Sequence, residues 1–126
     1  MREYNTVDDV LDAVWDVVEF GGYEARPTVQ SIGIFGSTPL FAPITWGDAN
    51  AVKLLLDAGI DCNVQRERGE TALHHAIQMG KFDIARMLLA HGADPRIRDI
   101  DGKASYDCCW EDEWDRIFGP NFKPGG

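Results

Sequence analysis

The sequence predicts an all-α fold in which short helix pairs stack side by side. Three observations lead to this prediction. Glycine landmarks recur every 33 residues, at Gly36, Gly69 and Gly102. Within each full period, apolar residues repeat at steps of three and four, as they do along one face of a helix. Further glycines follow each apolar stretch, where a residue without a Cβ ends a helix at little cost.

The best-formed unit runs from Gly69 to Gly102 and predicts two antiparallel helices followed by a loop. Thr71 can cap the first helix, because its hydroxyl can accept a bond from an unpaired backbone N–H. Gly80 ends that helix, and Gly92 ends the second. The apolar face of the second helix is made of Phe82, Ala85, Leu88 and Leu89.

Two four-residue motifs stand at the same place in consecutive units, Thr38-Pro39-Leu40-Phe41 and Thr71-Ala72-Leu73-His74. Together with the period, they resemble the Thr-Pro-Leu-His signature of the ankyrin repeat. The resemblance implies an ankyrin-repeat solenoid with two clear repeats, residues 36–68 and 69–101, between degenerate N- and C-terminal caps. In that family the signature histidine ties neighbouring loops by hydrogen bonds, which is the role expected for His74.

Residues 1–22 predict an N-terminal cap made of one amphipathic helix. Thr6 can cap this helix, and Gly21-Gly22 ends it. Its apolar face consists of Val7, Val10, Leu11, Val14, Val17 and Val18. We interpret it as the second helix of a repeat whose first helix is missing or degenerate.

Residues 23–35 form an insert, because Gly22 and Gly36 are 14 residues apart where the clear repeats allow ten. Its β-branched residues favour an extended loop or hairpin. Two interpretations stay open: a contact element carried on a rigid scaffold, or a tolerated surface insertion.

The repeat 36–68 departs from the pattern at its first helix. Phe41 replaces the signature histidine, and Pro43 falls within the helix, so we expect this helix to be kinked or short. Its second helix is expected from Asp48 to Ala58. The C-terminal cap, residues 102–118, continues the pattern incompletely, and residues 119–126 are expected to be a flexible tail, which makes 1–118 a single domain.

The net charge of −9 argues against binding to nucleic acid or to an anionic membrane surface. Residues 1–24 alone carry seven acidic side chains and one basic side chain. Polar ends keep a repeat stack soluble, and an acidic field can also attract a basic partner. The three cysteines show no disulfide framework, and no signal peptide or membrane-spanning run is evident, so a cytoplasmic location is expected.

No pattern in the chain predicts an enzyme, a cofactor or a metal site. His74 and His75 have no nucleophile at a motif spacing. The cysteines Cys62, Cys108 and Cys109 lie at no recognisable ligand spacing from the histidines. Glycine-rich phosphate-binding loops are absent from the sequence.

The resemblance implies that loop tips and first helices form a concave binding surface. Trp46 and Met79 hold the same place in consecutive repeats, just before Gly47 and Gly80, where the family presents exposed residues. Large apolar residues there indicate a protein-binding surface, although core packing of Trp46 is the alternative. The expected surface residues are Ile34, Phe35, Ser37, Thr45, Trp46, Glu67, Arg68, Glu70, Gln78, Met79, Ile100, Asp101, Lys103, Glu111 and Asp112.

The expected function is therefore non-enzymatic binding of a partner protein, with the free chain a monomer. The small size and acidity are similar to those of bacterial ankyrin immunity proteins, which implies a toxin or another basic enzyme as the inhibited partner. The alternative is a regulatory or scaffolding adaptor without inhibitory activity.

Overall fold

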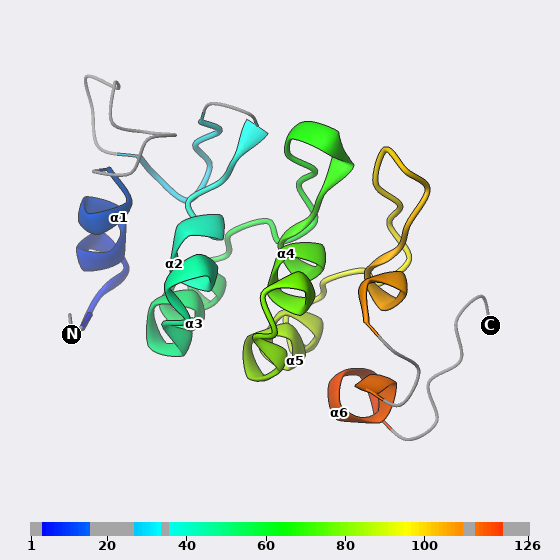
Figure 1. Cartoon of the computed structure of the whole chain (residues 1–126). Coiled ribbons are helices and arrows are strands. Elements are labelled where there is room, and N and C mark those ends of the chain that lie inside the picture. The colour runs from blue at the N-terminus through cyan, green and yellow to red at the C-terminus, as the bar shows by residue number, and fades with distance from the viewer. Residues whose placement is uncertain (1–3, 16–26, 34–35, 110–112, 120–126) are drawn as a thin grey trace.

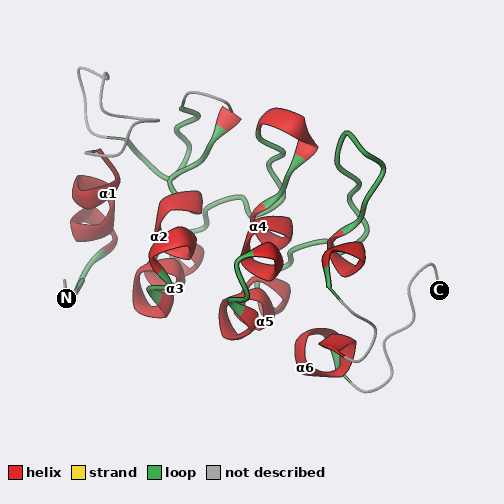
Figure 2. Cartoon of the chain, in the orientation of Figure 1, coloured by secondary structure: helices red, strands yellow, loops and turns green. Residues whose placement is uncertain are grey.

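The computed structural model describes residues 4–15, 27–33, 36–109 and 113–119. These residues form helices and loops and contain no β-strand (Figure 2). The five longest described α-helices are α1 (Val7–Trp15), α2 (Phe41–Trp46), α3 (Ala49–Asp57), α4 (Ala72–Gln78) and α5 (Phe82–Ala90). The others are the short helices η2 (Glu67–Gly69), η3 (Ser105–Cys108) and α6 (Trp114–Phe118). The predicted all-α solenoid is confirmed.

The helices lie in two rows, and the loops between the pairs project to one side (Figure 1). The first row contains α2, α4 and η3, each packed on the next, and the second row contains α1, α3, α5 and α6 in the same order. Because α1 packs mainly on α3, it takes the place of a second helix. No described helix precedes α2 in the first row.

The same backbone bonds end the helices of both full repeats. Gly47 and Gly80 each have a φ of 72°, a left-handed conformation that glycine adopts without steric cost. The residue after each glycine donates its N–H back into the helix, from Asp48 to the oxygen of Pro43 at 3.1 Å and from Lys81 to that of Ala76 at 2.8 Å. These bonds satisfy carbonyl groups that a helix end would leave unpaired.

The three projecting loops, which we call fingers, are each closed by one equivalent backbone bond. The donors and acceptors are Gly33 and Ser37 at 2.7 Å, Arg66 and Glu70 at 2.9 Å, and Asp99 and Lys103 at 2.9 Å. The closing bonds therefore recur with the 33-residue period found in the sequence. Residues 23–26, 34 and 35 of the predicted extended insert lie outside the described residues. Within its described part, residues 27–33, the segment Thr28–Ser31 forms a turn.

Neighbouring fingers approach closely at the turn glycines. A Cβ at Gly69 would lie 3.0 Å from the Cα of Asp99 in the third finger, and one at Gly36 would lie 3.1 Å from the Cα of Arg66 in the second. Contacts this short are tighter than nine in ten contacts of real Cβ atoms, so the neighbouring backbone would have to move by a few tenths of an ångström. The glycines thus serve both the turn and the packing of one finger on the next.

One apolar core runs between the two rows. Its fully buried side chains come from equivalent positions of the two repeats, since Leu40 matches Leu73 and Leu55 matches Leu88. Val10 and Val14 of α1 extend the core at one end, and Ile117 of α6 extends it at the other. Each added unit therefore continues the same buried layer, as expected of a repeat stack.

Helix α2 is short, as predicted, but Pro43 does not disrupt it. The helix has six residues and α4 has seven. Leu40 is the N-cap, so Pro43 lies in the first turn, where a backbone N–H has no partner within the helix in any case. The proline therefore costs α2 no internal hydrogen bond.

His74 has the structural role that the sequence predicted. It is fully buried, and its backbone N–H and its Nδ1 bond the hydroxyl of Thr71 at 3.3 and 2.7 Å. The Thr71 N–H also points to Nδ1 at 3.2 Å, so Nδ1 is an acceptor and Nε2 carries the proton. Nε2–H then donates to the carbonyl of Lys103 at 2.8 Å and ties α4 to the third finger.

Candidate protein-interaction surface

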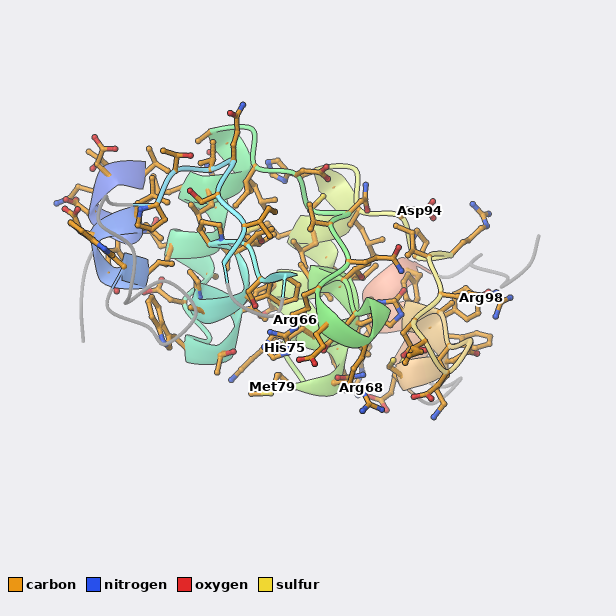
Figure 3. The ribbon with its side chains drawn as sticks, turned by 90° about the horizontal axis from the view of Figure 1, so that it is seen from above. Arg66, Arg68, His75, Met79, Asp94 and Arg98 are labelled. Atoms are coloured by element: carbon orange, nitrogen blue, oxygen red, sulfur yellow. The ribbon has the colours of Figure 1, made fainter. Side chains whose placement is uncertain are left out.

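The candidate surface is the side of the molecule formed by the exposed residues of α2, α4 and the fingers, which we call the first-row face. In the view from above, Met79 and Arg68 reach toward one edge of the molecule, whereas Asp94 lies at the opposite edge (Figure 3). Arg66 and His75 lie between these edges. The first-row face is thus separate from the second row of helices.

Trp46 and Met79 are the two large apolar side chains that α2 and α4 present to solvent. Each is 43% exposed, and each immediately precedes the glycine that ends its repeat's first helix. Matching exposure at matching positions follows from the repeat geometry. The core-packing alternative for Trp46 does not hold, because a core tryptophan would be mostly buried.

Trp46 is held from one side by Tyr4. The two rings are stacked, with centroids 6.4 Å apart and planes inclined by 17°. Tyr4 is itself buried, and its carbonyl accepts a bond from the side chain of Asn50 at 2.7 Å. These contacts restrict the indole before any partner arrives, which lowers the entropic cost of binding through it. Sequence reasoning missed Tyr4, because 42 positions separate the two aromatic residues and no periodic pattern links them.

The tips of the second and third fingers carry charges of both signs together with the apolar residue Ile100. Arg68 has a φ of 70°, and its carbonyl accepts the N–H of Ile100 at 2.8 Å, which joins the second and third fingers. The Arg68 guanidinium lies 3.7 Å from the carboxylate of Asp101. Ile100 is 72% exposed at the tip of the third finger. Glu67 and Lys103 are also exposed, so these two tips carry two acidic and two basic side chains.

A polar cluster lies beneath this face, where the second finger meets α2 and α4. Arg66 bonds Glu70 at 3.0 Å, and its guanidinium carbon lies 4.1 Å above the ring of Phe41. His75 contacts the hydroxyl of Thr45 through Nε2 at 2.7 Å. Its Nδ1 lies 3.2 Å from Arg66 Nη2 and 3.3 Å from Glu70 Oε1.

Burial and bonding act in opposite directions on Glu70 of this cluster. Burial opposes ionisation of the carboxyl, but hydrogen bonds from His75 and Arg66 and their positive charge outweigh it, so the pKa of Glu70 lies below its usual value. Glu70 is therefore a charged, largely buried structural group. Apart from the spacing of four between Arg66 and Glu70, no pattern in the chain indicates this cluster.

The remaining predicted surface residues divide into three groups. Thr45 and Gln78 are exposed on the first-row helices, as expected, and the side chain of Gln78 also reaches Cys108 Sγ at 3.6 Å. The expectation of an exposed Ser37 is wrong, since it is only 2% exposed at the base of the first finger. Ile34, Phe35, Glu111 and Asp112 lie outside the described residues.

The cysteines lie in protected surroundings. Burial raises the pKa of the Cys62 and Cys108 thiols, and burial together with the nearby carboxylate of Glu113 raises that of Cys109 to about 11. A thiol with a raised pKa is a poor nucleophile and a poor metal ligand near neutral pH. Within the described ranges, no three histidine, cysteine or acidic side chains are placed to hold a metal ion together.

Comparison with known proteins identifies the repeat. A family model described as ankyrin repeats, three copies, matches residues 8–99. The chain belongs to the ankyrin-repeat family. Ankyrin repeats are in general non-enzymatic modules that bind other proteins. No helix in the described parts of this ankyrin chain is long and apolar enough to cross a bilayer.

Several ankyrin proteins align with parts of the chain. An ankyrin repeat protein of Acanthamoeba polyphaga mimivirus is 40% identical over 74 residues, 56% of this chain and 46% of the relative. One from Rickettsia felis is 39% identical over 70 residues, 55% of this chain and 23% of the relative. Human 2-5A-dependent ribonuclease is 43% identical over 60 residues, 47% of this chain and 8% of the enzyme. The chain thus spans less than half the length of each of these relatives.

Proposed function

We propose that this ankyrin chain is a non-enzymatic interaction module that binds a partner protein through its first-row face. The observation that carries the proposal is the pair Trp46 and Met79, each 43% exposed at the same position of consecutive repeats. Tryptophan and methionine are enriched in the contact centres of protein interfaces. The stacking of Tyr4 on Trp46 adds preorganisation to that centre.

The surroundings of this pair fit the rim of a protein interface. Thr45 and Gln78 flank the two apolar residues on α2 and α4 and are uncharged. The finger tips add charges of both signs, Glu67, Arg68, Asp101 and Lys103. An apolar centre with a polar rim is the layout in which a few central residues supply most of the affinity.

A more specific form of the proposal is an immunity protein that inhibits a cognate toxin in the cytoplasm and is monomeric when free. The net charge of −9 supports it, since acidic inhibitors associate quickly with basic enzymes. The acidic and basic residues of the second and third finger tips balance, so the excess of acidic residues lies elsewhere in the chain. Electrostatic attraction would therefore raise the rate of association with a basic partner more than it would strengthen the contact at the finger tips. A scaffolding adaptor is the alternative, favoured by the same neutral tips.

The test is a binding titration with two matched double variants. Affinity capture from the source cells supplies the partner, and calorimetry then measures its affinity. Trp46→Ala with Met79→Ala should weaken binding by about 2–4 kcal/mol, the loss expected for contact-centre residues. Asp83→Ala with Arg86→Ala, on the exposed side of α5 in the second row, is the control and should leave the affinity unchanged.

Three outcomes separate the alternatives. Equal affinity for the wild type and the Trp46/Met79 double variant would remove the first-row face as the binding surface. Loss of the partner's activity on binding, relieved by that variant, supports an inhibitor. Binding without any change in the partner's activity supports an adaptor.

A further inference from the structure

His75 occupies the junction between the two full repeats. The groups that face it are Phe41 and Thr45 from α2 and Arg66 and Glu70 from the second finger. Only Arg66 and Glu70 among these carry charge. The His75 side chain is 12% exposed, and those of Arg66 and Glu70 are 19% and 18% exposed, so all three are largely removed from water.

The hydrogen bonds of Thr45 fix the role of Nε2. The Thr45 hydroxyl donates its one proton to the carbonyl of Phe41 at 3.2 Å. Its oxygen can then only accept from His75, across the 2.7 Å contact with Nε2. Nε2 therefore carries a proton whether the ring is neutral or charged.

Two partners compete for Nδ1. Arg66 Nη2 is a donor at 3.2 Å and needs an unprotonated Nδ1. Glu70 Oε1 is an acceptor at 3.3 Å and needs an Nδ1–H. In the neutral ring, Nδ1 accepts from Arg66, and Glu70 Oε1 is a buried oxygen without a hydrogen-bond partner among the described residues. A buried acceptor left in this state is unfavourable.

We propose that His75 is a proton-controlled switch at this junction, in which protonation moves the bond of Nδ1 from Arg66 to Glu70. The protonated ring satisfies Glu70 Oε1 with a charge-assisted bond, the stronger kind of hydrogen bond. Arg66 keeps its bond to Glu70 Oε2 and its stacking on Phe41 in both states. Protonation therefore exchanges one bond between α4 and the second finger for a stronger one, while Nε2 keeps α4 tied to α2.

Two opposite charges lie near Nδ1: the Glu70 carboxylate at 3.3 Å favours protonation of the ring, and the Arg66 guanidinium at 3.2 Å opposes it. The new bond exists only while His75 is protonated and Glu70 is ionised. Burial opposes ionisation of Glu70, but the bonds it accepts lower its pKa, so it stays ionised to a lower pH than a free glutamate. The stability that the new bond adds is therefore present in acidic solution, and it is lost as rising pH removes the proton from Nδ1.

The test is a double-mutant cycle with His75→Gln and Glu70→Gln, measured by urea unfolding at pH 5.5 and pH 8.0. Glutamine can still bond Thr45 but cannot take up a proton. The coupling between positions 70 and 75 should be about tenfold larger in the unfolding equilibrium constant at pH 5.5. All residues other than positions 70 and 75 are the same in the four proteins, so their contributions cancel in the cycle. Equal or weaker coupling at pH 5.5 would overturn the proposal.

Nitrogen NMR of the ring gives a second readout that does not depend on His75→Gln folding. In the wild type, Nδ1 should resonate as an acceptor nitrogen at pH 8.0 and as an N–H nitrogen at pH 5.5. In Glu70→Gln, protonation of Nδ1 should require a more acidic solution. Identical titration curves in the two proteins would also refute the switch. Neither experiment involves a partner, so both outcomes are independent of the proposed function.

Discussion

Replacing Gly69 with alanine should destabilise the fold for two reasons, one conformational and one steric. The first cost is conformational, because Gly69 has a φ of 75°, and a residue with a Cβ is disfavoured there by about 1–2 kcal/mol. The second is steric, because the new Cβ would lie 3.0 Å from the Cα of Asp99 and the N of Ile100. Those are backbone atoms of the next finger, so relief requires a shift of the finger, which adds about 1–3 kcal/mol.

Gly102→Ala is the matched control. Its φ of 78° imposes the same conformational cost, but no described atom lies within 4 Å of its Cβ position. Urea unfolding followed by circular dichroism should therefore give a loss of about 1–2 kcal/mol for Gly102→Ala and about 2–5 kcal/mol for Gly69→Ala. Gly36→Ala, 3.1 Å from the Cα of Arg66, should behave like Gly69→Ala. Equal losses at all three positions would refute the packing argument.

Two further predictions concern buried groups. His74→Ala should destabilise the fold by about 2–4 kcal/mol in the same assay, because it removes a fully buried ring and leaves the Lys103 carbonyl without its donor; a loss below about 1 kcal/mol would contradict the finger-tying role. Cys109, with a pKa of about 11, should react with iodoacetamide at pH 8 about 100-fold more slowly than free cysteine, whose pKa is near 8.5. Mass spectrometry of the labelled peptide measures that rate, and a rate near that of free cysteine would contradict the burial of this thiol.

The period and the helix ends were predictable because they depend on local chemistry. A glycine after a helix, a threonine before one and apolar residues at helical spacing each act within a few residues of their own position. For this reason the second helix of the first full repeat was placed within one residue at each end, with Asp48 as its N-cap. His74 was equally accessible, because its bond to Thr71 spans three residues.

Side-chain direction was less predictable than position. Ser37, Glu70 and Lys103 are equivalent in the repeat, yet Ser37 is buried, Glu70 is in an ion pair and Lys103 is exposed. A 33-residue period predicts that their backbones match, as the finger-closing bonds show. The size and charge of each side chain then decide whether it turns inward, and that choice depends on residues far away in sequence.

Contacts between residues far apart in the sequence could not be predicted from it, for the same reason. The stacking of Tyr4 on Trp46 joins the N-terminal stretch to the first full repeat, and the contact of Thr45 with His75, which are 30 residues apart in sequence, joins the two full repeats. Neither pair belongs to the repeat signature. Such side-chain contacts differ from one repeat to the next, although the backbone is periodic.

The open side of the third finger bears on how this molecule could be lengthened. Gly102 keeps the backbone conformation of Gly69, with φ of 78° and 75°, while its Cβ position has no described neighbour. A designed 33-residue module grafted at this point would meet a turn already shaped to receive it. The number of units, and with it the area offered to another molecule, is therefore a property that an engineer can set without redesigning the existing repeats.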